Sequence, residues 1–164
     1  MRGGLFVIYK MLFVYALISA AVITDYKYYK IPNTLNLWGL ISAIYLNLFL
    51  LGQYNLYSIA IGFVVPFFIL YPVFMIGGIG AGDIKLLCVI GTVLGMKSIV
   101  IFTAFCFMIA GIIGILKLFS SVNRGKGKKG YVMHKIHFSY AIYVASILEP
   151  ILNNIYSISE GGFL

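Results

Sequence analysis

The sequence predicts an all-α protein, a polytopic membrane helix bundle with about six transmembrane helices in one domain over residues 1–164. Of its residues, 62% are hydrophobic and only 10% are charged, whereas soluble domains carry about 25% charged residues. The mean hydropathy is +1.04. The apolar runs approach the roughly 20 residues that a helix needs to cross the hydrocarbon layer. They are continuous, unlike the alternating strands of a membrane barrel, which indicates helices.

Six apolar runs define the expected spans. They are Leu5–Thr24, Leu35–Leu51, Tyr57–Ile79, Ile84–Met96, Ser98–Phe119 and Ile136–Tyr156. The fourth run is short, and the sequence leaves open whether it joins the fifth across Lys97. The first run also has features of a cleaved signal peptide, but Lys10 interrupts it and five further runs follow. We therefore expect it to remain as the first span.

The basic residues predict the orientation in the plasma membrane. Most of them fall in the odd-numbered connections between the expected helices, whereas Arg2 and Lys97 lie on the opposite side. By the positive-inside rule, the odd-numbered connections are cytoplasmic and both termini face outward. The net charge of +8 does not indicate nucleic acid, because the basic residues lie between apolar runs. The basic loop "SSVNRGKGKKGYVMHK" reads as a solvated topogenic loop or as a contact with anionic lipid headgroups.

The first connection, "TDYKYYKIPNTLNL", carries one of the only two aspartates of the chain, Asp25. Asp25 comes where the first helix leaves the membrane. Pro32 disfavours helical geometry at Ile31 and suits the first turn of the next helix, where Asn33 can bond local backbone groups. Ile31, Pro32 and Asn33 therefore predict a fixed turn back into the membrane.

The second aspartate, Asp83, lies in "GGIGAGDIKLL" between the third and fourth runs. Glycine frees the backbone there and permits close approach, and Asp83 and Lys85 open the fourth helix. Both aspartates are thus expected at the cytoplasmic face. Two carboxylates that share a site can hold one proton between them and act as acid and base in peptide hydrolysis. The alternative for each is a helix-capping or interfacial role.

Three other functions fit parts of the sequence. A small proton-coupled transporter or export subunit would also use paired carboxylates, but near the bilayer midplane and at broken helices. A metal-dependent membrane hydrolase would need His134 and His137 to join the aspartates. A non-enzymatic assembly scaffold would be a protein derived from such an enzyme that has lost its activity. Both aspartates that the activity would need are present, however. Cys88 and Cys106 form no CxxC pair, so we expect no metal and no cofactor.

Two stretches carry a resemblance to a known family. "GAGDIK", residues 80–85, resembles the GxGDxK signature of the membrane aspartyl proteases of the prepilin peptidase and preflagellin peptidase family. "DYKYYKIPN", residues 25–33, resembles the first motif of that family, an aspartate followed by Ile-Pro-Asn. A weaker match to the family is "IHFSYAIYVASIL", in which His137 occupies the position where family members often have proline.

The resemblance implies that Asp25 and Asp83 are the catalytic pair of an aspartic endopeptidase. Gly80 and Gly82 would let the loop bend Asp83 towards Asp25, and Ile31, Pro32, Asn33 and Lys85 complete the motifs. The implied partners are the lipid bilayer and pilin-like precursors, whose short basic leader is removed at the cytoplasmic face, typically after glycine. The chain resembles the short family form without the cysteine-rich insert, which argues against methyl transfer.

Overall fold

Long apolar runs form helices in this protein because a helix satisfies every backbone polar group within the segment. The computed structural model describes residues 2–50, 56–123 and 138–148. The described helices are α1 (Arg2–Tyr28), α2 (Asn33–Tyr45) with a π-helical turn (Leu46–Leu50), α3 (Leu56–Met75), α4 (Ala81–Leu94), α5 (Met96–Asn123) and a last helix (Phe138–Leu148). No strand occurs in these ranges, so the all-α class is confirmed.

Within the described ranges, three segments are long and apolar enough to cross a membrane: Ile8–Tyr28, Leu56–Met75 and Met96–Leu116. The remaining helices are shorter. The 14 residues of α4 extend about 21 Å at about 1.5 Å per residue, less than the roughly 30 Å of the hydrocarbon core. The chain is thus a helical membrane protein, and the count of six spans stays a prediction.

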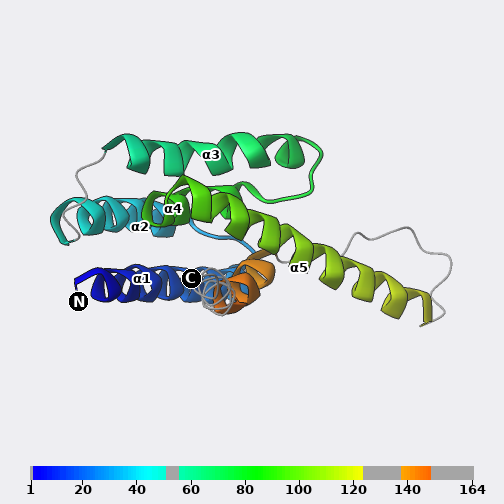
Figure 1. Ribbon diagram of the computed structural model, residues 1–164. Helices are drawn as coiled ribbons and strands as arrows, with labels where there is room; N and C mark the ends of the chain where they lie inside the picture. Colours follow the sequence, from blue (N-terminus) through cyan, green and yellow to red (C-terminus); the bar gives the residue numbers. More distant parts are fainter. Residues whose placement is uncertain (1, 51–55, 124–137, 149–164) are drawn as a thin grey trace, which may run out of the picture.

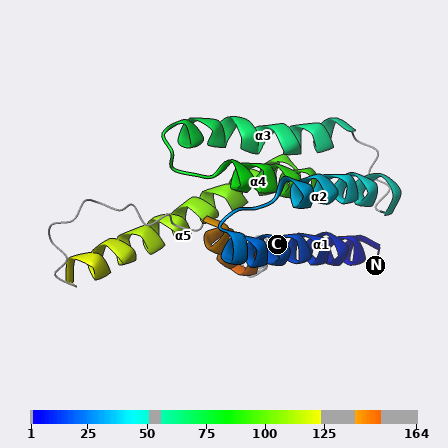
Figure 2. The same ribbon diagram turned by 180° about the vertical axis from the view of Figure 1, so that it is seen from behind.

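Successive helices reverse direction, and α4 lies at the centre of the bundle (Figures 1 and 2). α4 contacts α1, α2, α3 and α5. The fourth and fifth helices are separate, because Gly95 adopts a φ of 82° between them. α5 then runs past the ends of the other helices (Figure 1).

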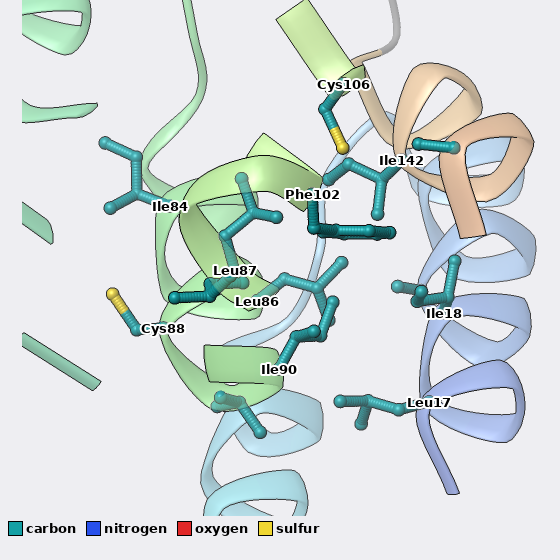
Figure 3. Close-up of a cluster of buried hydrophobic side chains, with 14 of the residues drawn as sticks. Leu17, Ile18, Ile84, Leu86, Leu87, Cys88, Ile90, Phe102, Cys106 and Ile142 are labelled. Atoms are coloured by element: carbon teal, nitrogen blue, oxygen red, sulfur yellow. The ribbon is translucent and has the colours of Figure 1, made fainter. Parts of the chain in front are cut away.

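The core forms around α4 because every residue from Leu86 to Val93 is buried, so this part of the helix is covered on all sides. Its side chains meet those of α1, α5 and the last helix in one buried cluster (Figure 3). Among the members labelled there are Leu17, Ile18, Leu86, Leu87, Ile90, Phe102 and Ile142. Ile18 of α1 and Ile142 of the last helix thus pack around α4. Both are completely buried, as is Ile90 of α4 itself.

α3 approaches α4 through a pair of glycines. A Cβ placed on Gly62 would overlap the carbonyl oxygen of Gly91, and a Cβ on Gly91 would overlap that of Gly62. Small residues at such crossings let membrane helices pack closely, since lipid leaves no hydrophobic force to drive helices together. These two glycines therefore set the distance between α3 and α4.

Two interhelical hydrogen bonds fix neighbouring helices in register. Asn47, which is 1% exposed, donates from Nδ2 to the Thr92 carbonyl oxygen of α4 at 2.9 Å. The Tyr15 hydroxyl of α1 donates to the Ser146 carbonyl oxygen of the last helix at 2.6 Å. Each bond crosses between helices that are far apart in sequence, so it aligns elements that chain connectivity does not.

The glycine pair yields a stability prediction. Gly62→Ala and Gly91→Ala should each destabilise the folded protein by about 1–3 kcal/mol, because the added methyl overpacks the α3–α4 crossing. Thermal unfolding of the detergent-solubilised protein measures the change.

Gly111→Ala is the matched control, since nothing lies within 4 Å of a Cβ at Gly111 of α5. The same alanine should be neutral or slightly stabilising there, because alanine favours helix more than glycine does. Equal unfolding temperatures for all three variants would contradict the close α3–α4 contact.

Candidate functional site

The first motif begins in the last turn of α1. Asp25 is buried, at 8% exposure. α1 ends because Tyr29 takes a left-handed φ of 52°, and its N–H donates to the Asp25 carbonyl oxygen at 2.8 Å. This is a common way for a helix to stop, although it is costly for a residue other than glycine. The strained end of α1 is thus one helical turn after the buried Asp25 carboxylate.

The predicted turn back into the bundle follows at once. Ile31 is buried, and Pro32 caps α2 in an extended conformation with φ −69° and ψ 142°. Asn33 is the first residue of α2. The turn expected from Ile31, Pro32 and Asn33 is therefore present.

The second motif opens α4. After α3 ends at Met75, Gly77 takes a φ of 77°. Gly80 is the N-cap of α4, and as a glycine it supplies no capping side chain. Asp83 lies in the first turn, not at the N-cap. Its carboxylate folds back over Gly80, since a Cβ there would lie 3.0 Å from Asp83 Oδ2.

The two motifs touch one another. A Cβ on Gly82 would lie only 3.1 Å from Ile31 Cβ, so glycine permits this approach. Lys85 Nζ donates to Asn33 Oδ1 at 2.9 Å, on the exposed side of the contact. Asn36 Nδ2 donates to the Gly82 carbonyl oxygen at 3.3 Å. Three separate contacts thus hold the GxGD segment against the Ile-Pro-Asn turn.

All of the site residues expected from the sequence therefore gather at one end of the bundle. Both aspartates lie at helix ends, Asp25 before the turn and Asp83 after the glycines. A transporter with carboxylates in mid-helix is not the arrangement found here. The Lys85–Asn33 bond also gives Lys85 a partner that the sequence did not reveal.

Two polar residues at this end were not expected from the sequence. Ser139 of the last helix donates from Oγ to Asp25 Oδ2 at 2.5 Å, and both groups are buried. Asn36 is 5% exposed, and its Oδ1 is buried without a hydrogen-bond partner among the described residues. The signal for both was a polar side chain inside an apolar run, which alone does not say what it faces.

Metal ligation has no support within residues 2–50, 56–123 and 138–148. No group of three or more His, Cys, Asp or Glu side chains there could hold a metal ion. His134 and His137, considered as ligands above, lie outside the described residues.

Comparison with known proteins agrees with this site. Residues 11–115 match the model of the type IV leader peptidase family. This span contains both aspartates and both motifs. No curated protein and no solved structure matches the chain. Because the family match extends over more than half of the residues, the chain belongs to the type IV leader peptidase family.

Proposed function

We propose that this protein is a membrane-embedded aspartic endopeptidase with Asp25 and Asp83 as its catalytic pair. The observation that carries the proposal is the direct contact between the two aspartate-bearing segments, through Gly82 on Ile31 and through Asn36 on the Gly82 carbonyl oxygen. Membership of a leader peptidase family supports peptide hydrolysis at this place.

The chemistry follows from two carboxylates acting together. One carboxylate accepts a proton from the attacking water, and the other donates a proton to the carbonyl oxygen or to the leaving amine. The low polarity around a buried carboxylate strengthens its interaction with the charge that develops on the substrate.

The substrate class follows from the family and from the position of the site. We propose that the protein removes the short basic leader of prepilin-like precursors at the cytoplasmic face of the plasma membrane. Lys27, Lys30 and Lys85 lie next to the two motifs, and an excess of basic residues marks the cytoplasmic side of a membrane protein. A precursor held by its own apolar helix would present its leader junction at this depth.

The catalytic pair can be tested by amide substitution. Asp25→Asn and Asp83→Asn should each abolish cleavage of a co-expressed precursor with a basic leader, a glycine junction and an apolar helix, because an amide cannot exchange the proton. Precursor length on a gel is the measurement.

Glu160→Gln supplies a matched control, since it makes the same carboxylate-to-amide change outside both motifs. It should cleave like the wild type. If either aspartate variant, verified to be present in the membrane, still shortened the precursor, Asp25 and Asp83 would not be the catalytic pair.

Gly80 gives a prediction about the Asp83 carboxylate. Its φ of −81° and ψ of 146° accept alanine, so Gly80→Ala acts through the 3.0 Å approach of its Cβ to Asp83 Oδ2. A displaced carboxylate should lower the cleavage rate by roughly 10- to 100-fold. Gly111→Ala, whose added Cβ meets nothing within 4 Å, should leave the cleavage rate unchanged. If Gly80→Ala cleaved as fast as the wild type and Gly111→Ala, the close approach of residue 80 to the Asp83 carboxylate would be unimportant for the reaction.

Chelation separates this mechanism from that of a metal-dependent hydrolase. Two carboxylates need no metal to move a proton, so excess EDTA should leave precursor cleavage unchanged. Loss of cleavage with EDTA and its return on adding Zn²⁺ would favour a metal site that includes His134 and His137.

A further inference from the structure

We propose that Ser139 is a positioning residue for the reaction, which holds the Asp25 carboxylate in one orientation. This inference rests on the proposed function, because it assigns Ser139 a task at the Asp25–Asp83 pair. Ser139 belongs to neither sequence motif, and it lies outside residues 11–115 that define the family match.

The direct contact is a buried hydrogen bond. Ser139 Oγ donates to Asp25 Oδ2 at 2.5 Å, with Ser139 1% exposed and Asp25 8% exposed. The last torsion of an aspartate is broad and poorly fixed by its own geometry. A hydroxyl bound to one named oxygen removes that freedom, and a bond to a carboxylate is among the stronger hydrogen bonds in proteins.

Ser139 can hold Asp25 only because its own helix is held. Two turns further along this helix, the Ser146 carbonyl oxygen accepts the Tyr15 hydroxyl of α1 at 2.6 Å. Phe138, next to Ser139, packs on Phe107 of α5 with ring centroids 5.3 Å apart. The last helix is therefore fixed against both α1 and α5.

The chain contains a matched control on the same helix. Ser146 lies seven residues after Ser139, on the same helical face, and it is also 1% exposed. Its hydroxyl donates only locally, to the Tyr143 carbonyl oxygen at 2.7 Å. Ser146→Ala thus removes a buried hydroxyl of equal size without touching Asp25.

The kinetic test uses the same precursor with basic leader, glycine junction and apolar helix. Ser139→Ala should lower kcat by roughly 10- to 100-fold, as expected for a misplaced reacting group. KM should stay nearly unchanged, because Ser139 touches the carboxylate and not the precursor. Ser139→Thr keeps the hydroxyl and should restore most of kcat, and Ser146→Ala should match the wild type.

A second readout does not depend on activity. Since Asp25 and Asp83 are the only aspartates, labelling with [4-¹³C]aspartate gives two carboxyl signals in the detergent-solubilised full chain. Asp25→Asn and Asp83→Asn assign them. Ser139→Ala should move the Asp25 signal, and Ser146→Ala should leave it in place. If the alanine variant does not accumulate, Ser139→Cys serves, because a thiol is a poor donor of similar size.

Each outcome decides between the alternatives. A moved Asp25 signal with lowered kcat, rescued by threonine, supports the positioning role. An unmoved Asp25 signal, or a moved signal with wild-type kcat, overturns that role while the proposed protease stands. Equal losses of kcat in Ser139→Ala and Ser146→Ala also overturn it, since they mean general destabilisation. If the wild type cleaves no precursor while the Asp25 signal still moves, the proposed function fails, and the assigned role fails with it.

Discussion

The close approach of neighbouring backbones to α4 is the constraint on which the rest of the bundle depends. α3 reaches α4 through Gly62 and Gly91, and the first connection reaches it through Gly82. Lipid offers no hydrophobic force between helices, so van der Waals packing and interhelical hydrogen bonds must hold them. A central helix with glycine at its contacts allows both, and it places the start of α4 against the Ile-Pro-Asn turn.

Two buried asparagines hold the two ends of α4. At one end Asn36 binds the Gly82 carbonyl oxygen, and at the other Asn47 binds the Thr92 carbonyl oxygen. α2 together with the π-helical turn that follows it is therefore tied to both ends of α4, although the chain between them passes through α3. A buried amide that lost its partner would be costly, so these bonds oppose any sliding of α2 along α4.

Much of this arrangement follows from the sequence alone. Continuous apolar runs predicted the helices, and the residues around Pro32 predicted a fixed turn that the structure contains. The break between α4 and α5 could not be decided, because Gly95 permits a positive φ without requiring one. The Ser139–Asp25 bond joins residues that are 114 positions apart, and such contacts depend on how helices pack rather than on any local pattern.

The position of Ser139 also bears on how members of this family should be compared. The span that defines the family ends at residue 115, whereas the hydroxyl on Asp25 comes from the helix Phe138–Leu148. A shortened protein that kept only the defining span would retain both aspartates yet lose this contact and the carbonyl that Tyr15 binds. The part of the chain that orients the Asp25 carboxylate thus extends beyond the residues that identify the family. Two relatives with identical motifs can therefore differ in how firmly this carboxylate is held.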